Sequence, residues 1–432
     1  MKKYHVSLNE MLLVREIRAN IQRQLLREGG RLVCFTMNIP GEIKRTPLVR
    51  MLFDRGMAEL NAGLDGQIKY TLTIDRTTGP EGYLLTDMPD EQVKNITQCI
   101  EEKFPAARLF DMDVIGDKGK LSRANRRKCL ICSRPAVECA RSRAHGEAAV
   151  IRMTEKLLRG YAEEMLSEAA YMSLLDELYT TPKPGLVDKN NNGAHSDMNV
   201  PLFEKSAEAL KPYFRQAVRI GMSGGGMRTL REVGMRCEKT MFIATSGINT
   251  HKGIIYSMGL LLAGIGRSIT EGGEWIENAV ALARADIETR LKNAGEHPLT
   301  NGNKVYAAYG AKGAVGEAAE GFKTALFAAD RLRDYSELTD TPGILVLCDI
   351  MGILEDTNIL HRGGKPGLEF VQNRAKEIGM LPIKQRKDEL YKMDKEMIER
   401  NLSPGGCADI LALAYFMAKW EKIAEDLFVY II

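Results

Sequence analysis

The stretch from Glu147 to Tyr179, EAAVIRMTEKLLRGYAEEMLSEAAYMSLLDELY, marks a change in the character of the chain. Its apolar side chains return every three or four residues, which is the period of one face of an α-helix. Similar patterns recur over 201–221, 225–244, 251–268, 272–293, 313–334, 342–357, 366–400 and 406–430, and the alternation typical of strands is nearly absent. We therefore expect residues 147–432 to form an all-α domain, a bundle of many helices.

Residues 1–128 show a different pattern, in which helical and strand-like segments alternate. A helical period begins after Ser7, which is a suitable N-cap, and a second one covers 48–64. Strand-like runs are RLVCFTM, the two segments around the Thr-Gly-Pro turn of IKYTLTIDRTTGPEGYLLTDM, and RLFDMDVIG. This order predicts an α/β domain, with a mixed sheet and helices, at residues 1–146.

The overall composition is that of a globular protein. The chain has 432 residues, of which 44% are hydrophobic and 27% are charged. No run of about 18 apolar residues predicts a transmembrane helix, and charges interrupt the apolar residues near the N-terminus, so we expect a cytosolic protein. Eight cysteines in this length argue against a disulfide framework and favour thiols or metal ligands.

The charge is distributed unevenly along the chain. Residues 1–150 hold 25 Lys and Arg against 19 Asp and Glu, a balance of +6, whereas the remaining 282 residues hold 35 against 38, a balance of −3. A basic first part suits an acidic partner or a phosphorylated substrate. An ordinary solvated surface explains the same charge equally well.

Two carboxylates lie two residues apart in the predicted strand RLFDMDVIG, at Asp111 and Asp113. Residues with this spacing point to the same face of a strand, and the two negative charges need a compensating cation. Enzymes that transfer phosphoryl or nucleotidyl groups use such pairs to hold Mg²⁺ on a polyphosphate. An exposed strand face is the alternative, because Asp-x-Asp is common. Basic residues that would hold phosphates, or pair with surface carboxylates instead, are Arg15, Arg18, Lys44, Arg45 and Arg76.

A cysteine-rich segment separates the two parts, CLICSRPAVECARSRAH, with candidate zinc ligands at Cys129, Cys132, Cys139 and His145. Thiolates and an imidazole at such spacing can surround a tetrahedral zinc ion. The alternative is a set of reduced thiols beside a basic linker. Binding of nucleic acid is a third interpretation, although no interleaved aromatic residues support base stacking.

Five polar loops interrupt the helical part, namely TPKPGLVDKNNNGAHSDM (181–198), SGINTHKG (246–253), YGAKGAVGEAAEGF (309–322), EDTNILHRGG (355–364) and LSPGGCADIL (402–411). Helical bundles usually have short, plain connections. Glycines let the backbone approach a ligand, and the first N–H groups of a helix favour anions. Together the loops predict a nucleotide site, although each glycine pair is also a common helix stop.

The residues predicted to bind the nucleotide are Lys183, His195, Asn249, His251, Lys252, Arg362, Gly363, Gly364, Gly405 and Gly406. Carboxylates that offer oxygens to Mg²⁺ or accept a proton are Asp188, Glu317 and Asp356, with Asp197 and Asp409 beside them. We expect Asp188, Glu317 and Asp356 to be catalytic in the helical domain, and Asp111 and Asp113 in the first domain.

The five loops, in this order, resemble the triphosphoribosyl-dephospho-coenzyme A synthase family over residues 150–432. The first 150 residues resemble the citrate lyase holo-acyl-carrier-protein synthase family (apo-citrate lyase phosphoribosyl-dephospho-CoA transferase), through SLNEMLLVREIRANIQRQLL, TGPEG, RLFDMDVIG and CLIC…CARSRAH. The resemblance implies a fused protein. It has a nucleotidyltransferase-like domain at 1–146 and a synthase domain at 147–432.

The resemblance also implies two consecutive reactions. First, a ribose hydroxyl of 3′-dephospho-CoA displaces adenine from ATP and gives 2′-(5″-triphosphoribosyl)-3′-dephospho-CoA, which needs anchored phosphates and a stabilised oxocarbenium-like centre. Second, a serine of the citrate lyase acyl carrier protein attacks the α-phosphorus and releases diphosphate. By analogy, Asp111 and Asp113 would hold Mg²⁺, and the basic domain would attract an acidic carrier protein.

Two departures and two alternatives accompany this interpretation. Many members of the synthase family carry a small hydroxyl residue where this chain has Cys407 and an arginine where it has Val315. If either side chain touches phosphate in those relatives, either the affinity for phosphate differs here or Lys312 substitutes. The equivalent pathway of malonate decarboxylase is one alternative. A non-catalytic zinc-bearing module that binds RNA or protein through residues 122–145 is the other.

Overall fold

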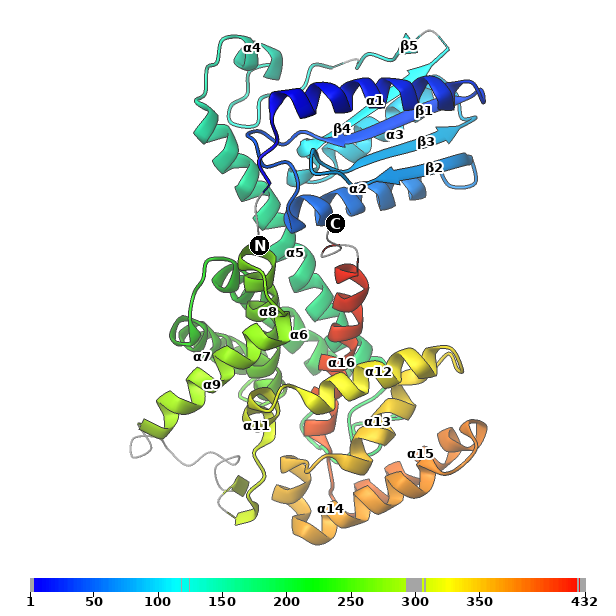
Figure 1. The fold of residues 1–432 in the computed structure, drawn as a ribbon. Coiled ribbons are helices and arrows are strands. Elements are labelled where there is room, and N and C mark those ends of the chain that lie inside the picture. The colour runs from blue at the N-terminus through cyan, green and yellow to red at the C-terminus, as the bar shows by residue number, and fades with distance from the viewer. Residues whose placement is uncertain are drawn as a thin grey trace. The chain divides into compact units, whose positions relative to one another are not determined.

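A computed structural model describes residues 4–117, 119–123, 125–292, 305–306, 308–425 and 427. By its internal contacts the chain divides into two compact units, unit 1 with Met1–Ala162 and Ile423–Ile432, and unit 2 with Glu163–Lys422. The division falls inside the long helix α5 (Glu147–Tyr179). Each unit has its own architecture, shown in Figure 1.

Unit 1 is built on a five-stranded sheet with the order β2-β3-β1-β4-β5. The strands are β1 (Arg31–Met37), β2 (Ile68–Ile74), β3 (Glu81–Thr86), β4 (Phe110–Gly116) and β5 (Gly119–Lys120). The helices are α1 (Leu8–Leu26), α2 (Pro47–Gly63), α3 (Asp90–Glu102), the 3-10 helix η1 (Pro105–Leu109) and α4 (Ala136–Arg141). The prediction of a mixed sheet is wrong, because every described pair is antiparallel. Strands β3 and β4 run in the same direction, but β1 lies between them.

The two faces of this sheet are covered by different helices. Val33 and Phe35 of β1 belong to a core cluster that takes in apolar residues of α2, α3 and η1. Leu32 and Cys34 point to the opposite face, where Ile21 and neighbouring apolar residues of α1 cover them. Alternate residues of a strand point to opposite faces, so the apolar run of β1 fits a strand buried on both sides.

The regular elements of unit 2, among its described residues, are all helices. Its helices are α6 (Val200–Met222), α7 (Met227–Ala244), α8 (Lys252–Glu271), α9 (Trp275–Lys292), α11 (Gly313–Ala319), α12 (Lys323–Ser336), α13 (Pro342–Ile353), α14 (Thr357–Gly379), α15 (Ile383–Glu399) and α16 (Gly405–Ala424). Two expected helices are each divided in two. The segment 313–334 breaks at Phe322, whose φ is 53°, and 366–400 breaks before Pro382, the N-cap of α15. The expected ends of two helices, at 293 and 430, lie outside the described residues.

Helix α8 is the central helix of unit 2, and fourteen of its twenty residues are buried. It is the one described helix long and apolar enough to cross a membrane, but 78% of its most apolar window is buried inside the protein, as in the core helix of a soluble fold. Glycines allow its neighbours to come close. A Cβ at Gly221 of α6 would overlap the Ala263 carbonyl of α8, and a Cβ at Gly264 would overlap the Trp275 carbonyl of α9.

Replacing Gly221 by alanine should therefore destabilise unit 2 by about 1–3 kcal/mol, because the backbone of α8 has to move away. Gly234→Ala in α7 is the matched control, since a Cβ there meets only ordinary van der Waals contacts beyond 3.5 Å. That change should be neutral or stabilise by up to about 1 kcal/mol. Urea unfolding of both variants measures the difference, and equal free energies of unfolding would contradict this account of the packing.

Candidate functional sites

Strand β4 places the two predicted metal-binding carboxylates on one face. Phe110, Met112 and Val114 point into the core, while Asp111 and Asp113 alternate with them and remain 50% and 29% exposed. Across the sheet, Thr36 of β1 pairs with Asp111 on one side and with Glu81 of β3 on the other. A row of polar side chains therefore crosses three strands on this face.

Cations surround this row. Lys120 of β5 donates to Asp113 at 2.6 Å, and Arg127 lies 4.0 Å from Asp111. Arg127 is itself held by the buried Glu101, at 2.5 Å, and by the carbonyl of Phe110. An arginine fixed in this way is directed toward the carboxylates without neutralising them completely.

Glu81 organises the other end of the row. Its carboxylate is 1% exposed, accepts a hydrogen bond from Arg18 at 2.6 Å and another from the Tyr83 hydroxyl at 2.7 Å, and lies 3.8 Å from Arg76. Two of the five predicted phosphate-binding cations, Arg18 and Arg76, are thus brought to the Asp111 face.

The other predicted cations have different surroundings. Arg45 forms a bidentate pair with Asp75. Lys44 donates to the carbonyl of Ile39, and burial lowers its pKa. Arg15 is exposed on α1.

The four candidate zinc ligands converge, and their donor atoms all lie within 4.8 Å of one another. Cys132 Sγ lies 3.5 Å from Cys139 Sγ and 3.4 Å from His145 Nε2. Sulfur atoms bound tetrahedrally at about 2.3 Å from zinc are about 3.8 Å apart, so the arrangement has the size of a zinc site. Cys129 and Cys132 come from a turn, Cys139 from α4, and His145 from the segment before α5.

The centre of the polar region in unit 2 is a buried ion pair. Lys183, from the loop after α5, donates to Glu177 of α5 at 2.6 Å, and their side chains are 2% and 8% exposed. Two opposite charges withdrawn from water stabilise the fold only as a pair, because an unpaired charge in this place costs about 3–5 kcal/mol. The pair ties the start of the 181–198 loop to the helix before it.

Asp188 gives the same loop its shape. Its carboxylate accepts hydrogen bonds from the backbone N–H groups of Lys183, Asn190 and Asn191 at 2.7–3.1 Å. Asp394 of α15 adds a second anchor, since it accepts from the Gly185 N–H and from the Asn191 side chain. The proline-rich, asparagine-rich sequence is therefore an ordered loop held by two buried carboxylates.

Three further predicted segments meet this centre. His251 caps the start of α8, is 6% exposed, and lies 2.7 Å from the Ser206 hydroxyl. Burial, with the charge of Lys183, lowers the pKa of His251 to about 3, so the imidazole is neutral. Asp356 caps α14 and also accepts the N–H of Cys407 at 2.8 Å, which joins the start of α14 to the start of α16.

The last member of the centre is Asp409 of α16. Its carboxylate touches Gly253 at the first turn of α8. Burial raises the pKa of Asp409, and the negative charges of Glu177 and Asp356 raise it further. Side chains from α5, α8, α14 and α16 are therefore gathered at one place. We call Glu177, Lys183, His251, Asp356 and Asp409 the polar centre.

A second cluster lies at the edge of the 181–198 loop. Arg362 donates to the Ala194 carbonyl and to the Asn401 side chain, both at 2.9 Å, and lies 3.2 Å from His195 Nδ1. His195 Nε2 lies 2.8 Å from the Ser403 hydroxyl. Arg362 and His195 thus join the loop to the residues that precede α16.

The remaining predicted residues have local structural roles. Glu317 accepts from the N–H groups of Thr324 and Ala325 and caps α12. Lys252 lies 3.1 Å from Glu238, and its N–H donates to Asn249. The predicted glycines permit close packing or a bend: Gly363 lies against Leu402, Gly364 has a φ of 61°, Gly405 lies against Asn358, and Gly406 lies against Asp356.

Several residues that complete the two sites were not predicted from the sequence. In unit 1 they are Glu81 and Glu101, and in unit 2 they are Glu177, Ser206 and Asp394. The Thr-Gly-Pro-Glu-Gly motif contains Glu81 and is the one signal that pointed toward any of them.

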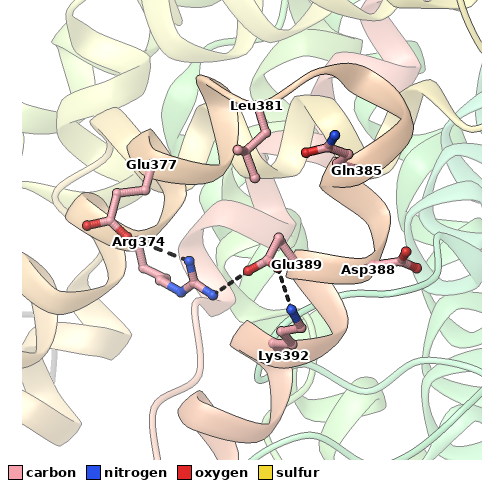
Figure 2. A pocket seen from close by; sticks show the side chains of 7 residues that line it. All are labelled: Arg374, Glu377, Leu381, Gln385, Asp388, Glu389 and Lys392. Atoms are coloured by element: carbon pink, nitrogen blue, oxygen red, sulfur yellow. Dashed lines mark hydrogen bonds and ion pairs between the residues drawn. The ribbon is translucent and has the colours of Figure 1, made fainter.

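Two surface pockets lie elsewhere in unit 2. A groove of about 420 Å³ between α14 and α15 contains none of the predicted site residues. Three of its charged residues, Arg374, Glu389 and Lys392, pair with each other in Figure 2. A pocket of about 450 Å³ lies beside the 181–198 loop, with Thr180, Thr181 and Tyr415 in its lining. Its lining also contains Asp176, Asp340 and Lys419, and Lys419 pairs with Asp176.

The state of His251 can be tested by NMR. Its pKa of about 3 lies below the ordinary 6.5, so below pH 6.5 the unfolded chain binds a proton at this residue that the folded chain does not. The free energy of unfolding should therefore fall with pH, by up to about 1.4 kcal/mol per pH unit from this group. One imidazole signal should therefore stay neutral between pH 8 and pH 5 and be absent in His251→Gln. A midpoint above pH 5 for that signal would contradict the buried, neutral state.

Comparison with known families agrees with the two units. Residues 6–161 match the model of the apo-citrate lyase phosphoribosyl-dephospho-CoA transferase family, and residues 163–427 match that of the ATP:dephospho-CoA triphosphoribosyl transferase family. The chain is 36% identical to Protein CitXG of Haemophilus influenzae, over 96% of this chain and 97% of that protein. It is 31% identical to Protein CitXG of Leuconostoc mesenteroides subsp. cremoris, with the same coverage.

A shorter relative matches the second part of the chain. The 2-(5''-triphosphoribosyl)-3'-dephosphocoenzyme-A synthase of Haemophilus ducreyi is 37% identical, over 66% of this chain and 98% of that protein. The chain therefore belongs to both transferase families, the apo-citrate lyase phosphoribosyl-dephospho-CoA transferases and the ATP:dephospho-CoA triphosphoribosyl transferases, joined in one polypeptide.

Proposed function

We propose that the polar centre of unit 2 is where the triphosphoribosyl group passes from ATP to 3′-dephospho-CoA, and that the Asp111 face of unit 1 is where the product passes to a carrier protein. The chain is a bifunctional transferase that makes and attaches the prosthetic group of citrate lyase. The observation that supports the location in unit 2 is the meeting of four helix ends around buried charges.

In unit 2, the starts of α8, α14 and α16 lie near the polar centre, and Lys252 stands at the first turn of α8. Such helix starts are suited to a triphosphate. The neutral His251 offers an uncharged ring nitrogen, which would not compete with the cations for phosphate. Arg362, whose donors reach the 181–198 loop and Asn401, would position that loop against the substrate.

In unit 1, Asp111 and Asp113 fit a Mg²⁺ site, because both project to one face and both keep exposed oxygens. Mg²⁺ bound there would reduce the charge of the triphosphate and stabilise the departing diphosphate. Arg127, Arg18 and Arg76 surround the row and would hold the phosphate oxygens. The serine of the acceptor would approach from the solvent side of Asp111, which is the more exposed carboxylate.

The partner proposed for unit 1 is the citrate lyase acyl carrier protein. The balance of +6 over residues 1–150 would attract an acidic carrier and increase the rate of encounter. We place the protein in the cytosol, where ATP and dephospho-CoA are present and where reduced cysteines can serve as ligands.

We further propose that Cys129, Cys132, Cys139 and His145 hold a structural zinc ion. Thiolates and an imidazole are the ligands that zinc prefers, and their donor atoms already lie within 4.8 Å. Arg108 lies in η1, which leads into β4. Its side chain donates to the carbonyls of Lys128 and Cys129, so the cysteine loop is joined to η1. A fixed loop would keep Arg127 beside Asp111.

Asp111→Asn should abolish labelling of the carrier protein and leave the release of adenine from ATP and dephospho-CoA within about twofold, because the two sites use different residues. The matched control is Asp117→Asn, which changes a carboxylate that is 76% exposed just beyond the same strand. Mass spectrometry of the carrier and chromatography of free adenine measure the two steps.

Loss of both activities in Asp111→Asn, with an unchanged melting temperature, would contradict the division of labour between the units. Retention of carrier labelling would contradict the assignment of Asp111. Testing the acyl carrier proteins of citrate lyase and malonate decarboxylase side by side checks the choice of acceptor.

The zinc proposal predicts one zinc ion per chain by elemental analysis. Cys132→Ser should lose the metal, because three ligands remain, whereas Cys99→Ser changes an exposed cysteine outside the cluster and should keep it. We expect the metal-free protein to melt at a lower temperature and to recover when zinc is added. Purified protein that contains no zinc and takes none up would overturn the proposal.

A further inference from the structure

We propose that Asp409 is the general acid of the synthase reaction and gives the departing adenine its proton. This inference rests on the function proposed for the polar centre and assigns one residue of that site a chemical role. Asp409 lies near the start of α16, is partly buried, and has no hydrogen bond or ion pair with any residue in the described part of the chain.

The absence of a partner distinguishes Asp409 from the carboxylates around it. Glu177 is bound by Lys183, whereas Asp356 and Asp188 each accept three backbone N–H groups. Those three side chains hold the structure of the site. Asp409 is the member whose oxygens remain available to a ligand.

The position of Asp409 is fixed by a glycine. Its Oδ2 occupies the place where a Cβ of Gly253 would be, at the first turn of α8. Gly253 follows His251 and Lys252, so the carboxyl lies against the segment proposed to meet the nucleotide. Any side chain at position 253 would displace the carboxyl.

The charges that face Asp409 favour its protonated form. Burial raises its pKa well above the ordinary value, and the negative charges of Glu177 and Asp356 add to the effect. Lys183, the cation beside Glu177, is engaged by that carboxylate, and His251 is neutral. A carboxyl whose pKa is raised in this way is suited to general acid catalysis, as in glycoside hydrolysis.

The proposed step balances as follows. The bond between C1″ of the ATP ribose and N9 of adenine breaks, and its electron pair stays on the base, while the Asp409 O–H bond breaks and the proton goes to adenine. The 2′-hydroxyl oxygen of dephospho-CoA forms the new bond to C1″, and its proton passes to solvent water. Asp409, left as a carboxylate, takes a proton from solvent before the next cycle.

The test compares two leaving groups in the full-length enzyme. Asp409→Asn keeps the shape of the side chain but cannot donate the acidic proton, so kcat for adenine release from ATP should fall at least about 100-fold. With 6-chloropurine riboside triphosphate, whose electron-poor base leaves without protonation, the loss should be below about tenfold. Asp388→Asn, an exposed carboxylate in the groove of Figure 2, is the control and should match wild type with both nucleotides.

Two further readouts separate this role from a structural one. In wild type, kcat should fall as the pH rises through the pKa of Asp409, because the acid loses its proton, and Asp409→Asn should lack this limb. Attachment of chemically prepared triphosphoribosyl-dephospho-CoA to the carrier should be unchanged in the variant.

Equal losses with ATP and the chloropurine nucleotide, or retention of more than a third of the adenine release in Asp409→Asn, would overturn the proposal. Failure of the proposed function itself is a different result, in which the wild-type enzyme releases no adenine.

Discussion

The buried pair of Lys183 and Glu177 is the interaction on which the site in unit 2 depends. Both side chains are almost completely removed from water, and each is tolerated there only because of the other. The pair holds the 181–198 loop against the end of α5, and from that position the loop is fastened further by Asp188 and Asp394. Without it, the starts of α8, α14 and α16 would lack the charged group that they surround.

This arrangement explains why so many polar residues occur in a helical domain. Hydrogen bonds to Asp188, Asp356 and Asp394 satisfy backbone N–H groups of loops and helix starts that would otherwise be buried without partners. The same bonds join the start of α14 to the start of α16 and fasten the 181–198 loop to α15. Among the carboxylates of the polar centre, Asp409 is the one without a hydrogen bond or ion pair to any described residue.

The sequence predicted much of the fold from local patterns. The all-α character of the second part, the helix after Ser7 and the strand of Asp111 and Asp113 are confirmed, because periodicity and capping are local properties. The antiparallel pairing and the strand order were not predictable in this way, since they depend on contacts between residues far apart in the chain. The breaks at Phe322 and before Pro382 were missed because the apolar period continues across both.

For the sites, the loop motifs predicted which segments are involved better than they predicted the roles of single residues. Lys183 lies close enough to His251 to affect its pKa, and Asp356 affects that of Asp409. Glu317 and Lys252, in contrast, have local partners that no motif reveals. Glu177 was missed because it lies in an ordinary amphipathic helix. It is buried beside Lys183 only because the chain turns back between the two residues. The place of Arg127 beside Asp111 depends likewise on the buried Glu101, which nothing in the sequence singles out.

Hydrogen–deuterium exchange of the full-length chain tests the central claim most directly, with and without ATP and dephospho-CoA. We expect peptides that cover 181–198, 249–255, 355–364 and 402–411 to gain protection together, because they surround one nucleotide. Protection confined to the groove between α14 and α15, or to a single one of the four segments, would contradict a shared site at the polar centre.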